Sequence, residues 1–331
     1  IDSIVEEAMR EGQIPGVSVA VTRGGEPVHV RGYGYADLEN DVEATPETVY
    51  RIGSVTKQFT SAAIMRLVEE GKIDLQDPVS EYIHGLPAWS DEVTIHHLLN
   101  HTSGVKSYTS VPEWLELMPL EMTHEEMLEV FKDEPVDFAP GDDWSYNNSG
   151  YYMLGMVIES VTDQTYAEYL EEEFYEPLGL EGTVYCGEAR LIENRAEGYV
   201  VEDGEIYNDP PIDMTQPYSA GSLCSTVVDL TRWARLLASG EVVSPASYRT
   251  MTTPTRLNDG TEHPYGYGLF TGTLEGEPSI AHGGGINGFI SYLAYYPEAD
   301  VSVAVLSNSQ SANSSAIAQE IARRVLGLPE E

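Results

Sequence analysis

The sequence predicts an α+β fold in which an antiparallel sheet flanked by helices takes its strands from both ends of the chain. Alternating runs rich in β-branched residues occur near each end, at residues 16–22, 28–34, 289–296 and 301–308. The stretch between them contains mainly helical patterns and loops. We therefore expect a sheet-based part made of residues 1–59 and 216–331, with a mostly helical part, residues 60–215, inserted into it.

Turn residues and apolar spacing place each element in order. Apolar positions at helical spacing predict an amphipathic helix over residues 1–11, and a Gly-Gly-Glu-Pro turn at residues 24–27 joins the first two strands. The turn at residues 297–300 joins the last two strands, and a helix follows at residues 314–326. Further helices are predicted between these ends, at residues 58–70, 94–101, 122–132, 149–161 and 165–174.

Charge is the extreme feature of the composition, because 55 acidic residues oppose 17 basic ones and give a net charge of −38. Nucleic-acid binding needs a basic surface, and anionic membranes repel an acidic one, so neither partner is expected. Membrane insertion is not expected either, since no apolar run approaches the length of a membrane span. A lysine-poor, carboxylate-dense surface resembles that of proteins from salt-loving organisms. We expect halophilic adaptation, the alternative being a merely acidic soluble protein.

The state of the two cysteines and the compartment stay open at this level. Cys186 and Cys224 either form one disulfide or remain two buried thiols, and their spacing does not decide between them. No signal peptide is recognised in the sequence. We expect a high-salt environment, with a secreted or periplasmic location favoured. The sequence does not determine the oligomeric state.

Ser54 and Lys57 form the most informative short motif, Ser-Val-Thr-Lys, at the start of a helical stretch. Residues three apart lie on the same face of a helix, so the hydroxyl and the amine are predicted to lie within reach of each other. A serine hydroxyl needs a neighbouring base to become a good nucleophile. A lysine can be that base only when burial or nearby charge lowers its pKa well below about 10.4. The pair therefore indicates the activated serine of an acyl-transfer enzyme.

A second Ser-x-x-Lys spacing, from Ser103 to Lys106, lacks these surroundings. Gly104 lies inside it, and the motif follows a predicted helix as a loop, so its side chains have no fixed register. We expect a surface serine near a solvated lysine there, without a catalytic role.

Two later motifs could complete an acyl-transfer site, which needs a proton shuttle and donors for the developing oxyanion. Tyr146 and Asn148 lie in a polar loop before a helix. The phenol could act as general base or acid if nearby cations lower its pKa, and the amide could bind the lysine or the substrate carbonyl. His282 precedes three glycines, which could let a substrate backbone approach closely. Taken singly, each motif is more often an ordinary loop or turn.

The order of the three motifs resembles that of the serine β-lactamase and penicillin-binding-protein superfamily, with Ser-x-x-Lys first, Tyr-x-Asn near the middle and His-Gly-Gly late. The most similar branch is class C-like and includes D-alanyl-D-alanine carboxypeptidases, D-aminopeptidases and family VIII esterases. Further segments resemble that branch, at residues 50–53, 94–104, 219–226 and 265–268. The resemblance covers nearly the whole chain and implies a β-lactamase-like fold.

The resemblance also implies a role for each residue of the first two motifs. Ser54 would be the acylated nucleophile and Lys57 its hydrogen-bonded partner. Tyr146 would be the general base or acid, and Asn148 would orient the lysine and the substrate. No metal or organic cofactor is implied.

The third motif supplies the remaining implied roles, together with two departures from the family. The oxyanion hole would use the backbone N–H groups of Ser54 and Gly285, with Gly284 beside them at the substrate edge. His282 would take the place of the lysine of Lys-Thr-Gly, and Gly283 stands where many relatives have a threonine or serine. Both changes weaken recognition of a substrate carboxylate. A neutral His282 would also make activity pH-sensitive between about pH 5 and 8.

The predicted function is a serine hydrolase that forms an acyl-enzyme on a small ester or on an amide or peptide bond, with weak β-lactam hydrolysis. The substrate would be a small molecule or a short peptide. Two alternatives stay open: a true class C-like β-lactamase, and a penicillin-binding or sensor protein that deacylates slowly. An α/β-hydrolase is not expected without a Gly-x-Ser-x-Gly elbow, and a metal site at His97 and His101 lacks the Glu of His-Glu-x-x-His.

Overall fold

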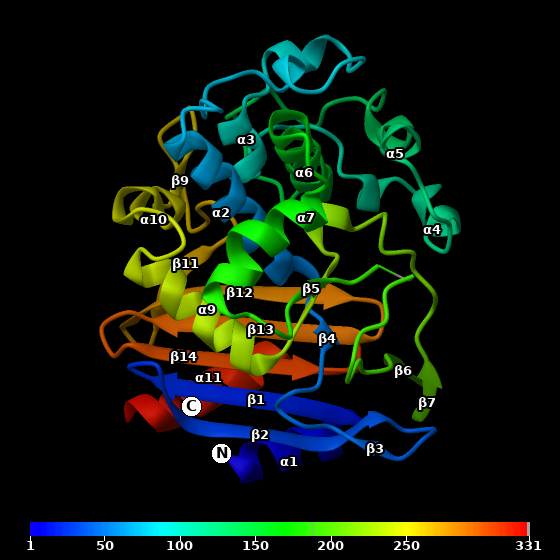
Figure 1. The fold of residues 1–331 in the computed structure, drawn as a ribbon, viewed down its shortest axis with the longest axis vertical. Helices are drawn as coiled ribbons and strands as arrows, with labels where there is room; N and C mark the ends of the chain where they lie inside the picture. The colour runs from blue at the N-terminus through cyan, green and yellow to red at the C-terminus, as the bar shows by residue number, and fades with distance from the viewer. Residues whose placement is uncertain (188, 330–331) are drawn as a thin grey trace.

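The computed structural model describes residues 1–187 and 189–329, and its centre is a seven-stranded antiparallel sheet (Figure 1). The strands are, in spatial order, β11 (Phe270–Leu274), β12 (Glu277–Ile286), β13 (Phe289–Tyr296), β14 (Val301–Ser307), β1 (Gly16–Arg23), β2 (Glu26–Asp37) and β3 (Val42–Glu43). β1 pairs with β2 on one side and with β14 on the other. Strands from the two ends of the chain therefore meet inside one sheet, and the predicted α+β class is confirmed.

Helices cover both faces of this sheet (Figure 1). On one face, α1 (Asp2–Gly12) and α11 (Ser314–Leu326) pack against alternate residues of β1, so that Val17, Val19 and Val21 share an apolar cluster with these helices. On the other face, α9 (Val227–Ser239) lies across β1, β13 and β14. β1 is consequently buried on both faces, from Gly16 to Thr22.

The middle of the chain is helical, and α2 (Thr56–Glu69) runs through its core, with eleven of its side chains buried. Phe59 of α2 stacks on Trp233 of α9 with the ring centroids 3.8 Å apart, which ties the helical region to the layer over the sheet. The other helices are α3 (Ile95–Leu99), α4 (Trp114–Leu117), α5 (His124–Phe131), α6 (Asn148–Thr162), α7 (Tyr166–Leu170), α8 (Glu176–Leu178) and α10 (Pro245–Met251). The domain boundaries at residues 59/60 and 215/216 stay a prediction.

Two predicted helices end earlier than the sequence pattern indicates, each for a visible reason. The one predicted at residues 94–101 ends as α3 at Leu99, because His101 takes a left-handed backbone conformation with φ of 65°. The one predicted at residues 165–174 changes after α7 into a π-helical turn, Glu171–Tyr175. Short strands form three further small sheets in the described residues. The first has the order β4 (Tyr50–Arg51), β8 (Leu223–Ser225), β5 (Val184–Tyr185). The other two are the pairs β6 (Tyr199–Glu202) with β7 (Glu205–Asn208) and β9 (Thr255–Arg256) with β10 (Glu262–His263).

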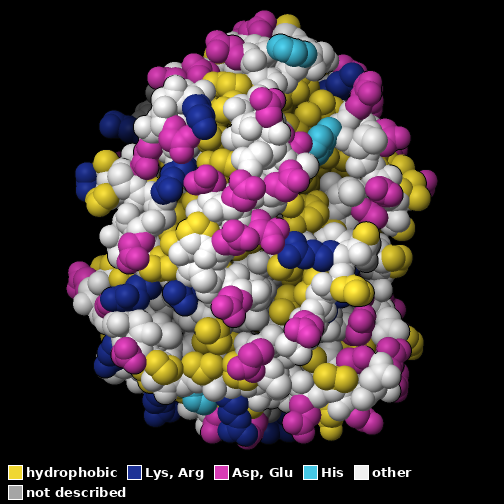
Figure 2. Space-filling model, viewed as in Figure 1, with side chains coloured by type: hydrophobic (Ala, Val, Ile, Leu, Met, Phe, Trp, Pro, Cys, Tyr) yellow, Lys and Arg dark blue, Asp and Glu magenta, His cyan; other side chains and the backbone are white. Residues whose placement is uncertain are grey.

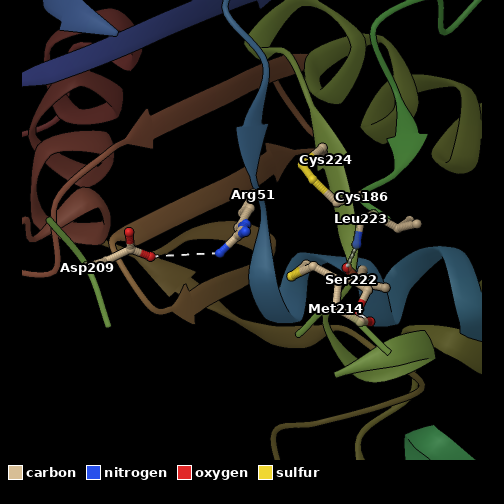
Figure 3. Close-up of a disulfide and its surroundings, with 8 residues drawn as sticks. Arg51, Cys186, Asp209, Met214, Ser222, Leu223 and Cys224 are labelled. Atoms are coloured by element: carbon tan, nitrogen blue, oxygen red, sulfur yellow. Dashed lines mark hydrogen bonds and ion pairs between the residues drawn. A yellow bond between two sulfur atoms is a disulfide. The ribbon is translucent and has the colours of Figure 1, made fainter. Parts of the chain in front are cut away.

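Cys186 and Cys224 form a disulfide, with their Cα atoms 5.3 Å apart, which decides between the two alternatives that the sequence left open (Figure 3). Both residues are buried. Cys224 lies in β8, which pairs with β4 directly before Ser54. The disulfide thus joins the chain after β5 to a strand next to the predicted nucleophile.

The surface is acidic on the face that Figure 2 shows, where Asp and Glu side chains are spread over most elements. Among the described residues, no helix is both long and apolar enough to cross a bilayer. The second Ser-x-x-Lys motif lies in a loop, but Ser103 is only 1% exposed, so the expectation of a surface serine was wrong. Lys106 is paired with Asp137 at 2.9 Å instead of being fully solvated.

Candidate active site

Ser54 lies in a single 3-10 turn, η1 (Gly53–Val55), that leads directly into α2. Gly53 has a φ of 49°, in the left-handed region, and its Cα lies against the backbone of Gly285 in β12. One turn further on, the Lys57 side chain is completely buried, and its Nζ lies 3.1 Å from Ser54 Oγ. The hydroxyl and the amine therefore meet as the three-residue spacing predicts.

The surroundings of Lys57 define its protonation state. Its Nζ donates to Asn148 Oδ1 and to the Ala220 carbonyl oxygen, each at 2.8 Å. Burial lowers the pKa of Lys57 well below its usual value. A neutral amine has two N–H bonds and one lone pair. Since the two oxygens can only accept, the lone pair is left for the Ser54 hydroxyl.

Tyr146 lies in the loop before α6, and its ring packs next to the Lys57 amine. Lys57 Nζ lies 4.8 Å from the centre of the Tyr146 ring. The Tyr146 hydroxyl is buried, and no described residue forms a hydrogen bond of ordinary geometry with it. Burial raises the pKa of Tyr146, and the nearby Ser54 hydroxyl offsets only part of this shift. The condition named in the sequence analysis, that nearby cations lower this pKa, is not met, so the resting residue is a neutral phenol that can donate a proton.

Asn148 is the first residue of α6, and its side-chain amide connects two parts of the site. Its Oδ1 accepts from Lys57, while its Nδ2 donates to Thr109 Oγ1 at 3.2 Å. The preceding Asn147 caps α6 by accepting from the Gly150 N–H. The cap fixes the start of the helix and with it the position of Asn148.

The glycine run forms a strand, and its members have different surroundings. β11 pairs only with residues 277–281 of β12, so residues 282–286 form a free edge of the sheet on that side, next to η1. Gly285 is exposed and lines a pocket together with Ser54. At Gly284, a Cβ would overlap the Ile52 carbonyl oxygen. Gly284 is therefore required by packing, and only Gly285 faces the place where a substrate carbonyl would lie.

His282 lies near Tyr146, with the ring centroids 6.1 Å apart, but the protein itself uses both of its ring nitrogens. Nδ1 donates to the Gly283 carbonyl at 2.6 Å, and Nε2 accepts from the Tyr265 hydroxyl at 3.1 Å. Burial lowers the pKa of His282 to about 3. The structure therefore leaves no ring nitrogen for substrate, and it moves the imidazole titration out of the range near neutral pH that the sequence led us to expect.

A pocket of about 120 Å³ opens beside Ser54. Tyr108, Trp114 and Ile212 give it apolar walls, Thr109 and Asn287 add neutral polar groups, and none of its lining residues carries a charge. Sequence reasoning missed most of these residues, because they lie in segments without a recognisable motif. It also missed the Ala220 carbonyl, since a backbone acceptor has no residue-type signal. Among the described residues, no group of three or more His, Cys, Asp and Glu side chains could hold a metal ion.

Known proteins of similar fold share this architecture. The solved structure of an octameric penicillin-binding protein homologue from Pyrococcus abyssi is 33% identical, with a TM-score of 0.88 over 99% of this chain and 77% of that one. A D-stereospecific amidohydrolase from Streptomyces sp. is 27% identical, with a TM-score of 0.84 over 99% of both chains.

Sequence comparison gives the family. A D-aminopeptidase from Gluconobacter oxydans (strain 621H) is 29% identical over 322 residues, which cover 96% of this chain and 60% of that protein. The chain spans between 60% and 63% of the length of the curated relatives that it matches. The family model described as Beta-lactamase matches residues 1–328. With nearly its whole length matched, this chain belongs to the Beta-lactamase family.

Proposed function

We propose that this protein is a serine hydrolase that acylates Ser54 with a small, uncharged amide or ester substrate and then hydrolyses the acyl-enzyme. The observation that carries the proposal is the buried Lys57 Nζ, which lies 2.8 Å from two amide oxygens and 3.1 Å from Ser54 Oγ. In its neutral form this amine donates to the two oxygens and accepts from the Ser54 hydroxyl. The D-aminopeptidase and the D-stereospecific amidohydrolase support an amide or peptide bond as the target.

In the acylation step, Lys57 accepts the Ser54 proton while the serine oxygen attacks the substrate carbonyl. The backbone N–H groups of Ser54 and Gly285 stabilise the oxyanion, since η1 and the free edge of β12 lie against each other. The unpartnered Tyr146 hydroxyl donates a proton to the leaving amine or alcohol, and the Lys57 ammonium then restores that proton.

Deacylation repeats the chemistry with water in place of the serine hydroxyl. Water attacks the ester carbonyl of the acyl-enzyme, and its proton passes to the neutral Lys57 and Tyr146 pair. Ser54 leaves as the alcohol and regains its proton. Every proton is therefore moved by groups that the buried site already holds, and none of the steps uses His282.

The pocket supports a neutral substrate. A penicillin or a peptide with a C-terminal carboxylate needs a cation to offset the cost of desolvating that group. None of the residues that line the pocket supplies one. Tyr108 and Trp114 instead offer aromatic surface to the bound molecule. We therefore expect esters and amides with uncharged acyl groups to be better substrates than β-lactams.

The test is a substrate panel assayed in high salt: p-nitrophenyl butyrate, D-amino-acid amides, D-Ala-D-Ala peptides and nitrocefin. We expect steady turnover of neutral esters or amides and weak hydrolysis of nitrocefin. Ser54→Ala should abolish turnover, whereas Ser103→Ala, in the second Ser-x-x-Lys motif, should preserve it. Full turnover by Ser54→Ala would refute the proposal.

The same experiment separates the two alternatives. A fluorescent penicillin that forms a stable, stoichiometric adduct on Ser54 without turnover of any substrate would identify a sensor. Nitrocefin hydrolysis faster than that of every neutral ester and amide would identify a β-lactamase. A burst of product followed by steady release is the result expected for the proposed hydrolase.

A further inference from the structure

The segment His101-Thr102-Ser103-Gly104 takes no part in the chemistry described above, yet it holds the loop that carries Tyr146. Three backbone hydrogen bonds connect this segment to residues 137–145. The donors are the N–H groups of Asp137, Gly141 and Ser145, at 2.8, 2.8 and 3.0 Å from the carbonyl oxygens of Gly104, Thr102 and His101. The segment therefore fixes the path of the loop up to the residue before Tyr146.

His101 extends this contact past Tyr146 with its side chain. Its carbonyl oxygen accepts from the Ser145 N–H, and its Nδ1 accepts from the Asn147 N–H at 3.0 Å. The two bonds lie on either side of Tyr146 in the chain. The His101 ring also lies against the Tyr146 ring, with the centroids 4.4 Å apart. One residue thus contacts the backbone before and after Tyr146 as well as its ring.

Asn147 transmits the position of His101 to α6. Its N–H is bound by the imidazole, and its Oδ1 caps the helix that begins at Asn148. Because Asn148 Oδ1 accepts from Lys57, the start of α6 determines where the lysine finds its acceptor. The left-handed backbone of His101, with φ of 65°, turns the chain so that its carbonyl and ring both face this loop.

The hydrogen bond with Asn147 also determines the form of the imidazole. A backbone N–H can only donate, so Nδ1 must be unprotonated and the ring proton must lie on Nε2. Burial keeps the pKa of His101 well below its usual value. The neutral ring is therefore the form in which the loop is held.

We propose that His101 is a positioning residue, whose neutral imidazole accepts the Asn147 N–H and thereby fixes the Tyr146 hydroxyl and the Asn148 amide around Lys57. The inference rests on the proposed hydrolase function. It accounts for a histidine that lies in the core of the site without touching the pocket.

The test compares two amide variants that differ only in which ring nitrogen they replace. In His101→Asn the side-chain oxygen takes the place of Nδ1, and asparagine also tolerates the left-handed backbone. In His101→Gln the amide takes the place of Nε2 instead. We expect His101→Phe and His101→Gln to lose about 100-fold in kcat with KM changed less than about threefold, because a displacement of about 1 Å has this effect on catalysis. His101→Asn should recover at least about tenfold of that loss.

Three controls make the result decisive. His96→Gln replaces a half-buried imidazole of α3, which bonds Tyr267 and Asn100, and should retain kcat. In the wild-type protein, long-range 1H–15N NMR should find His101 protonated on Nε2 throughout the range near neutral pH, and a proton on Nδ1 would overturn the proposal even if every variant failed to fold. Ser54→Ala tests the function separately: an inactive Ser54→Ala beside a fully active His101→Phe refutes only the role of His101. Equal rescue by Asn and Gln would refute it as well.

Discussion

Removing the disulfide between Cys186 and Cys224 is expected to lower the free energy of unfolding by about 4 kcal/mol. The bond joins residues 38 positions apart in the chain. In the chain-entropy treatment, a loop of this length costs the unfolded state about 13 cal/mol/K, which corresponds to about 3.9 kcal/mol at 25 °C. Since both sulfur atoms are buried, the smaller side chains of a Cys186→Ala/Cys224→Ala variant also leave unfilled space.

The closed loop contains functional groups, so the loss of the disulfide should also affect the site. Ile212 and Ala220 line the pocket and lie between the two cysteines, and the Leu223 carbonyl accepts from the Ile52 N–H directly before η1. We therefore expect the variant to have a raised KM below its unfolding temperature. The rise follows from a less ordered pocket wall, because the loop is then held only by its non-covalent contacts.

Urea denaturation in molar KCl, followed by tyrosine and tryptophan fluorescence, measures the change by linear extrapolation. The control is wild-type protein treated with reductant under native conditions, where the buried bond should persist and stability should not change. A double variant whose free energy of unfolding lies within about 1 kcal/mol of the wild-type value would refute the reasoning.

Three further predictions concern the glycine edge, the pH dependence and the surface charge. Gly284→Ala should destabilise the fold by about 1–3 kcal/mol, because the new methyl group overlaps the Ile52 carbonyl. In Gly285→Ala the methyl group meets only a side-chain atom at 3.4 Å, so this variant should change KM instead. Equal denaturation midpoints for the two variants would contradict this prediction. Because burial lowers the pKa of Lys57, kcat/KM should fall as the pH drops through that pKa. His282→Gln should leave the pH profile of kcat/KM between about pH 5 and 8 unchanged, since the pKa of His282 is about 3. The unfolded state binds a proton at Lys57 that the folded state does not, so this residue makes the free energy of unfolding rise with pH between the lowered pKa and about 10.4. The unfolding temperature should rise from dilute buffer to molar KCl, because salt screens the repulsion of a chain with net charge −38, and equal stability in both would end the halophilic interpretation.

The parts of the fold that the sequence predicts well are those whose signal is local. β13 and α11 begin and end where the alternating and helical patterns place them. The approach of Ser54 and Lys57 follows from helix geometry alone. A run of a few residues suffices for each of these predictions, because every residue in it obeys the same period.

The parts that the sequence does not predict depend on contacts between distant segments. Burial raises the pKa of Tyr146, and rings from other segments, including His101 and Tyr265, pack around its own ring; its neighbours in sequence give no sign of this. The glycine run gave the same difficulty. Its composition suggests a turn, but pairing with β13 makes it a strand, and only the Ile52 carbonyl explains why Gly284 has no side chain.

The place of β1 in the sheet has a consequence for biosynthesis. Its partner β14 is translated long after it, so the apolar strand β1 stays without that partner while the whole helical region between the two strands is made. During that interval a nascent chain with so many carboxylates repels its neighbours on the same polysome. The acidity that opposes compaction of the finished molecule therefore also protects it from aggregation before completion.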